Sequence, residues 1–278
     1  MSFKTILSVV GVDHKDGDLK LAAELCRETK AHLSILVLAP SAPIIVGTYG
    51  DVMSDAWVIE RQDELKRLKR RTDEVTAFAA KSDLSTDVAS EYCDGGALAE
   101  MVGRRARYAD MTVLGPTILA DGNYKNHVLD GGLFRSGRPV LVLAKDKTVT
   151  LKPKTVVVAW DGSKEAARAV ADSVDMLRHA KDVCLVMVDP SSSDVGNGAE
   201  PGADQAAYLA RCGVKVTVER IPSMGGPVSE ALQRFANDCG ADIIIMGAYG
   251  HSRLRERIFG GVSVSMIEAP VVPTLLAH

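Results

Sequence analysis

The residues best suited to chemistry lie near the C-terminus of the printed sequence. An apolar run, Ile243–Met246, leads into Gly247-x2-Gly250, and nine residues later Gly260-Gly261 precedes Ser263. Glycine lets the backbone adopt a positive φ and approach a ligand closely, and serine suits the first turn of a helix. Backbone N–H groups on such a loop, or at a helix N-terminus, bind phosphate. The spacing therefore indicates a phosphate-binding loop after a buried strand.

Other groups in the sequence give a weaker chemical signal. There is no Gly-x4-Gly-Lys-Ser/Thr loop and no Gly-x-Ser-x-Gly elbow, and five of the histidines show no metal-binding spacing: His14, His32, His127, His179 and His278. The sequence thus names no nucleophile, general base or metal site, and we expect no dedicated catalysis. Two side chains stay open: His251 either touches phosphate or is exposed, and Asp161 either contacts a ligand or caps a helix.

The overall composition is that of a soluble globular protein. The 278 residues are 46% hydrophobic and 25% charged, which leaves room for two domains. A net charge of -3 gives no electrostatic case for nucleic acid. No apolar run reaches membrane-spanning length, the short run after Thr5 is too short for a secretory signal, and the five cysteines are widely separated. We therefore expect a cytoplasmic protein without a disulfide framework.

The elements that must position the loop occur twice. A strand, Thr5–Val10, a helix, Asp18–Lys30, and a strand, Leu33–Leu38, recur 150 residues later, where Lys154–Ala159 repeats Lys4–Val9. Further repeats pair Ala109–Gly115 with Ala241–Gly247, and Arg138–Ala144 with Val272–Ala277. A repeat of this length predicts two domains, residues 1–146 and 154–278, joined by a polar linker around Lys145–Pro153.

The alternation of strands and helices predicts the fold. The strands are nearly continuous in Val, Ile and Leu, which is typical of parallel strands buried on both faces. We expect an α/β protein of two tandem doubly wound domains, with helices on both faces of each sheet. Ligands of such sheets bind beyond the carboxyl ends of the strands, and Gly247 follows such an end.

The glycine spacing, together with Val158–Ser163 at the end of an earlier strand, resembles the universal stress protein family. Nucleotide-binding members of that family carry Gly-x2-Gly-x9-Gly followed by Ser or Thr. The resemblance covers essentially the whole chain as two tandem family domains. It implies a five-stranded parallel sheet in each, with ATP over the strand ends of a binding domain. AMP and ADP are alternative ligands, and Mg²⁺ bound together with the nucleotide is a further expectation.

Carried over by position, the resemblance implies particular contacts. Asp161 and the backbone near Ala159 and Val188 would lie beside the adenosine, and Met246 and Gly247 near the ribose. Six residues would surround the phosphates: Gly250, His251, Gly260, Gly261, Val262 and Ser263. Gly261 departs from the family pattern, because it stands where the motif has Ser or Thr, and Ser263 could supply the hydroxyl instead.

The first half departs further from the motif. Gly115 is followed by Pro116, which has no N–H, Ile118 stands at the position of Gly250, and Gly11 replaces Asp161. We expect this half to be a nonbinding structural partner of the second. A different ligand near Asp13 and His14 remains an alternative.

The leading hypothesis is a stress-related regulatory protein that binds ATP or another adenine nucleotide in its C-terminal domain and acts through a protein partner. One alternative is a ligand-free interaction scaffold, and another is a slow ATPase or phosphotransferase. The apolar strands Val140–Ala144 and Val271–Ala277 could pair and form a dimer-like unit within one chain, and two chains could associate further.

Overall fold

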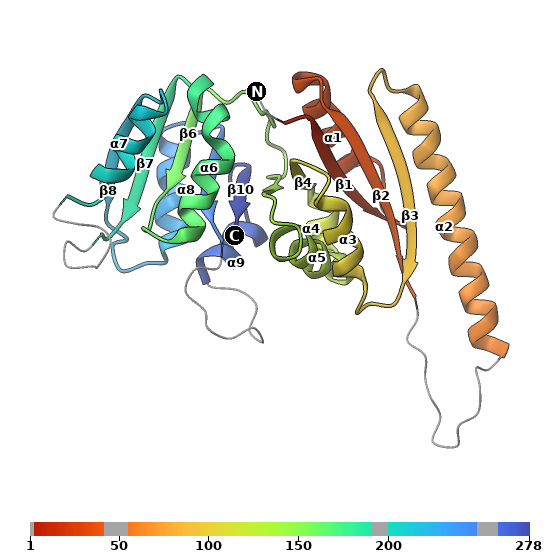
Figure 1. Ribbon diagram of the computed structural model, residues 1–278. Helices are drawn as coiled ribbons and strands as arrows, with labels where there is room; N and C mark the ends of the chain where they lie inside the picture. The colour runs from red at the N-terminus through yellow and green to blue at the C-terminus, as the bar shows by residue number, and fades with distance from the viewer. Residues whose placement is uncertain (1–2, 42–54, 191–199, 249–260) are drawn as a thin grey trace. The chain divides into compact units, whose positions relative to one another are not determined.

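A computed structural model describes residues 3–41, 55–190, 200–248 and 261–278 (Figure 1). The chain divides into two compact units, an N-terminal unit, Phe3–Ser136, and a C-terminal unit, Gly137–His278. Among the described residues, we find no helix with the length and apolar character needed to cross a membrane.

The N-terminal unit contains four parallel strands in the order β3-β2-β1-β4. They are β1 (Thr5–Gly11), β2 (His32–Pro40), β3 (Thr86–Cys93) and β4 (Met111–Leu114). The helices are α1 (Gly17–Thr29), α2 (Asp55–Lys81), α3 (Leu98–Ala106), α4 (Pro116–Ala120) and α5 (Gly122–Leu129), followed by a π-helical turn, η1 (Asp130–Phe134). Helices α1 and α3 pack against β1 and β2, and α2 packs against β2 and β3.

The C-terminal unit contains six strands in the order β5-β10-β9-β6-β7-β8. They are β5 (Val140–Val142), β6 (Thr155–Ala159), β7 (Asp182–Val188), β8 (Val216–Ile221), β9 (Ile243–Gly247) and β10 (Thr274–Ala277). The helices are α6 (Lys164–His179), α7 (Ala203–Arg211), α8 (Val228–Asp238) and α9 (Gly261–Glu268). Five strands are parallel, as predicted, and β5 runs antiparallel to β10.

Consecutive apolar residues form the central strands because helices cover the sheet on both faces. In β9, the side chains of Ile243, Ile244 and Ile245 are all fully buried, although successive strand residues point to opposite faces. Helix α6 packs against β6, β9 and β10, and α8 packs against β7. The predicted α/β, doubly wound fold class is confirmed.

The pairing of the strands follows the sequence repeat. Thr5 lies opposite His32 in the first unit, and Thr155 lies opposite Asp182 in the second, at the same offset of 150 residues. Asp110 and Asp242 also have matching roles. The Asp110 carboxylate accepts hydrogen bonds from the N–H groups of Lys4 and Thr5, and the Asp242 carboxylate accepts those of Lys154 and Thr155. The two halves thus fix their first strands in the same way.

The boundary between the compact units differs from the expected linker. The C-terminal unit begins at residue 137. It therefore includes strand β5, which comes from the first half of the repeat and pairs with β10. The predicted domain limits, 1–146 and 154–278, describe the two copies of the sequence repeat. They stay a prediction, because the compact units are divided at a different residue. All five cysteines are free thiols; Cys26 is buried, and the other four are partly exposed.

Candidate functional site

The point where the chain order reverses lies between β6 and β9 in the C-terminal unit. The chain passes from β6 to β7 on one side, and later enters β9 on the other side. Ala159, the last residue of β6, lies opposite Val186 of β7 and Met246 of β9. Val188 ends β7 two residues beyond Val186. Three of the predicted site residues, Ala159, Val188 and Met246, are therefore gathered at one edge of the sheet.

Asp161 is exposed in the turn that follows β6. Its carboxylate accepts a hydrogen bond from the N–H of Ser163 at 2.9 Å. Ser163 in turn caps helix α6, because its hydroxyl oxygen accepts the N–H of Ala166 at 3.1 Å. Ser163 is thus the helix cap, and Asp161 shapes the turn before it. The contact between Asp161 and a ligand stays a prediction.

Gly247 ends β9 against the first turn of α6. A Cβ atom at this position would overlap the backbone nitrogen of Ala166 and lie 2.6 Å from the carbonyl carbon of Glu165. Helix packing therefore requires glycine here, whether or not a ligand lies nearby. From the sequence, Gly247 was explained only by the approach of a ligand. The sequence does not show that the first turn of α6 lies against this residue.

A second polar group at this edge was not predicted. Asp189 directly follows Val188 with a φ of 46°, and its carboxylate accepts the N–H of Ser223 at 3.1 Å. Hydrogen bonds from the Ser223 hydroxyl and, secondly, from this N–H lower the pKa of Asp189. The exposed carboxylate is therefore ionised at neutral pH and joins the ends of β7 and β8.

The remaining predicted site residues lie at or before α9. Gly261 is its first residue, and no atom of the described residues lies within 4 Å of the place where a Cβ would be. Val262 is half-buried, and Ser263 is buried and already interacts within the chain. Gly250, His251 and Gly260 lie outside the described residues. The burial of Ser263 makes it a poor substitute for the hydroxyl that Gly261 lacks.

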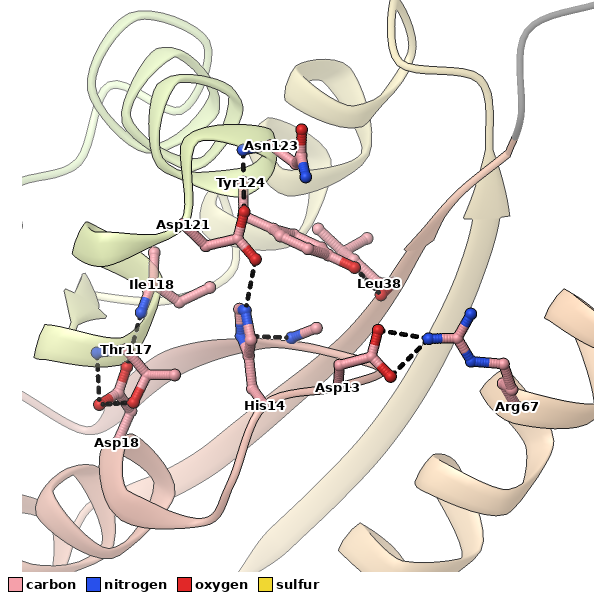
Figure 2. Close-up of polar contacts among 11 residues, drawn as sticks. Asp13, His14, Asp18, Leu38, Arg67, Thr117, Ile118, Asp121, Asn123 and Tyr124 are labelled. Carbon is pink, nitrogen blue, oxygen red and sulfur yellow. Dashed lines mark hydrogen bonds and ion pairs between the residues drawn. The ribbon is translucent and has the colours of Figure 1, made fainter.

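In the N-terminal unit, the corresponding edge is filled by the chain itself (Figure 2). The Tyr124 ring lies against Gly11, where a Cβ would be 2.7 Å from the Tyr124 Cζ. The Tyr124 hydroxyl donates to the carbonyl oxygen of Leu38 at 3.2 Å. Burial, chiefly, raises the pKa of Tyr124 to about 12, and the negative charges of Asp121 and Asp13 add to the shift. The phenol is therefore neutral and enclosed.

His14 is held in the same cluster. Its Nδ1 atom accepts the N–H of Gly11 at 2.9 Å, and its Nε2 atom lies 3.0 Å from a carboxylate oxygen of Asp121. Because a backbone N–H can only donate, the ring proton is on Nε2 and is donated to Asp121. The ring also meets Tyr124 edge to face, with 4.9 Å between the ring centroids. Both nitrogens of His14 are thus used inside the protein.

Asp18 fills the space beyond β4. Its carboxylate accepts the N–H groups of Thr117 and Ile118, at 3.2 and 3.1 Å, and the Thr117 hydroxyl at 2.9 Å. A Cβ at Gly115 would overlap this carboxylate. Asp13 is paired with Arg67 of α2. These contacts fill the space in which a nucleotide would bind, which is a physical reason to expect none in this half. Asp13 and His14, near which the sequence left a different ligand as an alternative, are bonded within the chain.

Comparison with known proteins agrees with the glycine motif. The model of the universal stress protein family matches residues 152–278, which include the strand ends described above. Over these residues, the chain is similar to the universal stress protein family. Universal stress protein Rv2005c of Mycobacterium tuberculosis is 26% identical over 243 residues, which are 81% of this chain and 80% of that protein.

Two further relatives extend the comparison. Universal stress protein Slr1230 of Synechocystis is 29% identical over 145 residues, which are 50% of this chain but only 46% of that protein. The crystal structure of a universal stress protein from Archaeoglobus fulgidus matches 98% of this chain and 95% of its own, with a TM-score of 0.69 and 17% identity. At that identity, the likeness shows the fold alone.

Several residues of the N-terminal cluster were missed by sequence reasoning. Tyr124, Asp121 and Asp18 carry no motif, and Tyr124 and Asp121 lie far from Gly11 and Leu38 in sequence. The one available signal was the loss of the family pattern at Gly11 and Ile118. That signal predicts the loss of a ligand contact, but not which side chain lies there instead.

Proposed function

We propose that this chain is a universal stress protein and that its C-terminal unit binds ATP or another adenine nucleotide at the carboxyl ends of β6, β7 and β9. The observation that carries the proposal is the register of these strands. It places Ala159 beside Met246, with the end of β7 next to them, at the reversal point where doubly wound sheets bind ligands. The glycine motif follows β9 directly in the sequence.

The proposed contacts follow the family resemblance. Asp161 and the backbone of Ala159 and Val188 hold the adenosine, and Met246 and Gly247 lie near the ribose. The phosphates take backbone N–H groups around Gly250, His251, Gly260, Gly261, Val262 and Ser263. AMP and ADP are alternative ligands, and Mg²⁺ enters with the phosphates of the nucleotide. The half-buried strand ends and the open space at Gly261 fit such a ligand.

We assign the site a regulatory role in a stress response, exerted in the cytoplasm through occupancy rather than turnover. We name no catalytic residue. A nucleotide-dependent signal of this kind needs a protein partner that distinguishes the occupied from the empty form. If purified protein released phosphate from ATP above a buffer control, and Gly250→Val abolished the release, the slow ATPase alternative would replace this proposal.

Thermal unfolding of the full chain with Mg-ATP tests the binding. A ligand that binds only the folded state at about 100 times its Kd stabilises that state by about 2.7 kcal/mol, so the melting temperature should rise with ATP concentration. Mass spectrometry of small molecules released from the purified protein identifies a ligand already bound. An unmoved melting curve at millimolar Mg-ATP, with no nucleotide released, would overturn the proposal.

The variant pair Gly261→Ser and Gly17→Ser locates the phosphates. Both glycines are the first residue of a helix, and neither has an atom within 4 Å of a built Cβ. Gly261→Ser restores a hydroxyl at the family position. A hydrogen bond to a charged group contributes roughly 1.5–3 kcal/mol, so ATP affinity should rise roughly tenfold or more. Gly17→Ser should leave the affinity for ATP unchanged. Equal ATP affinities in the two variants would show that the phosphates do not bind at the start of α9.

A further inference from the structure

We propose that Tyr124 is a built-in occupant of the cleft of the N-terminal unit, and that this cleft, without the tyrosine, is a site for a planar base of the adenine class. The cleft meant here is bounded by Gly11, Val12, His14 and Leu38. In the native chain, the phenol of Tyr124 occupies this place, bonded to Leu38 and beside the ring of His14 (Figure 2).

The position of Tyr124 supports this inference first. At the offset of 150 residues that both the sequence repeat and the strand register follow, Leu38 corresponds to Val188, and Gly11 corresponds to Asp161. The Tyr124 hydroxyl binds the carbonyl of Leu38, and its ring covers Gly11. The phenol thus contacts the counterparts of two residues that we assign to adenosine in the other unit.

The hydrogen-bonding pattern supplies the second argument. The phenol oxygen donates to the Leu38 carbonyl and also accepts a hydrogen bond from the backbone of Val12. An adenine ring has the same pair along one edge, an exocyclic amine that donates beside a ring nitrogen that accepts. The ring of His14 meets the Tyr124 ring edge to face. A planar base in the place of the phenol would meet the same histidine ring.

The third argument is that the segment leading to Tyr124 is fixed at two points. Before it, the Asp18 carboxylate holds the N–H groups of Thr117 and Ile118. At the start of α5, Asp121 accepts the N–H of Asn123 at 2.9 Å and pairs with His14. Tyr124 itself is only 5% exposed. A free ligand therefore cannot compete with the tyrosine unless the tyrosine is removed.

The first experiment measures the coupling between Gly11 and Tyr124. Gly11→Ala should lower the melting temperature by several degrees, because the new methyl group meets the Tyr124 ring. In a Tyr124→Leu background, which keeps apolar volume but removes the far end of the ring, the same change should cost less than half as much. Gly17→Ala, at a position with open space, is the control. An equal loss in both backgrounds would show that Tyr124 does not fill this place.

The second experiment tests the vacated site with two probes, p-cresol and adenosine. The full chain carries Gly250→Val, which silences the proposed C-terminal site, together with either Tyr124→Ala or Tyr108→Ala. Tyr108 is 86% exposed in the same unit and serves as the matched control. Both probes should raise the melting temperature of the Tyr124→Ala protein by several degrees at millimolar concentration and leave the control unmoved.

Two results would overturn the inference: no stabilisation of folded Tyr124→Ala by either probe, or equal stabilisation of the Tyr108→Ala control. If Tyr124→Ala does not fold, the Tyr124→Leu comparison above decides. The choice of an adenine-class base rests on the proposed function, because Val188 and Asp161 are assigned to adenosine there, whereas the filling of this space by Tyr124 does not. If ATP fails to stabilise the native chain while Tyr124→Ala gains adenosine binding, the proposed function falls and this inference stands.

Discussion

At the scale of single residues, three strand-end glycines have three different neighbours. Gly11 faces the ring of Tyr124, Gly115 faces the carboxylate of Asp18, and Gly247 faces the backbone of α6. At Gly261, the start of α9, no atom from the described part of the chain lies within 4 Å of a built Cβ. A glycine in a motif therefore shows that something comes close to the backbone, and the structure shows whether it is the chain itself.

Asp161→Asn separates the two roles of this side chain. Asparagine retains the oxygen that accepts the Ser163 N–H, so the turn and the melting temperature of the free protein should change little. The loss of negative charge should change nucleotide affinity several-fold if Asp161 contacts the ligand or its Mg²⁺. Isothermal titration with Mg-ATP measures this change. Unchanged affinity would restrict Asp161 to the turn.

The buried phenol of Tyr124 makes a prediction about alkaline stability. Its pKa is raised to about 12 in the folded protein, against roughly 10 for an unfolded chain. The contribution of the neutral phenol to stability is therefore fully present below pH ~10 and is lost as pH rises through ~12. Tyr124→Phe should lose less stability between these two pH values than the native chain.

Ultraviolet titration of the phenolates provides the check on this prediction. Burial and a hydrogen bond to Glu64 raise the pKa of Tyr92 to about 12 as well, and a hydrogen bond with Cys212 raises the pKa of Tyr208, so more than one late-titrating tyrosine is expected. Tyr124→Phe should remove one of them. If the substitution instead removed a group that titrates near pH ~10, the enclosed position of Tyr124 would be contradicted.

At the scale of elements, the packing of α6 on β9 positions the C-terminal strand ends. Ser163 caps α6, and the first turn of that helix lies against Gly247 at the end of β9. This contact fixes the turn that carries Asp161 beside the strand that leads into the glycine motif. The helix therefore determines the geometry of the candidate site even though we assign it no ligand contact.

Gly247→Ala should accordingly destabilise the C-terminal unit. Overpacking of a filled site costs about 1–3 kcal/mol, and the upper end applies here because the atoms in the way are backbone. Gly261→Ala, which meets no atom within 4 Å, is the control and should leave the free energy of unfolding nearly unchanged. Denaturant unfolding of both variants without nucleotide tests this. Equal stability of the two would contradict the packing described.

At the scale of the whole molecule, the two halves of the repeat do not end at the same place as the two compact units. Strand β5 comes from the first half and pairs antiparallel with β10 of the second, with Leu141 opposite Leu275. The pairing of these apolar strands, which the sequence suggested, is present. Its presence explains why the C-terminal unit begins at residue 137.

Leu141→Ala should therefore weaken the C-terminal unit, although it changes a residue of the first half. Leu141 is fully buried, and removal of such a side chain costs about 2–5 kcal/mol. Hydrogen exchange should become faster in the amides of β10. Leu65→Ala, at a 42% exposed position of α2, is the comparison and should cost much less. Unchanged exchange in β10 would argue against the β5–β10 pairing.

The sequence by itself determined the α/β class, the repeat and the edge of the sheet that carries the candidate site. These features depend on local patterns, because a buried parallel strand needs a continuous apolar run, and a glycine after such a run marks a close approach. The offset of 150 residues read from the sequence also reappears in the strand register.

Only the tertiary structure decided what lies opposite each glycine. Tyr124 reaches Gly11 across 113 positions of sequence, and Asp18 reaches Thr117 across 99. Neither contact has a local pattern, because it depends on how α4 packs against β1 and α1 and how α5 packs against α4. The sequence showed that the first half departs from the nucleotide motif. The fold showed that the phenol of Tyr124 lies against Gly11 and that the carboxylate of Asp18 lies against Gly115.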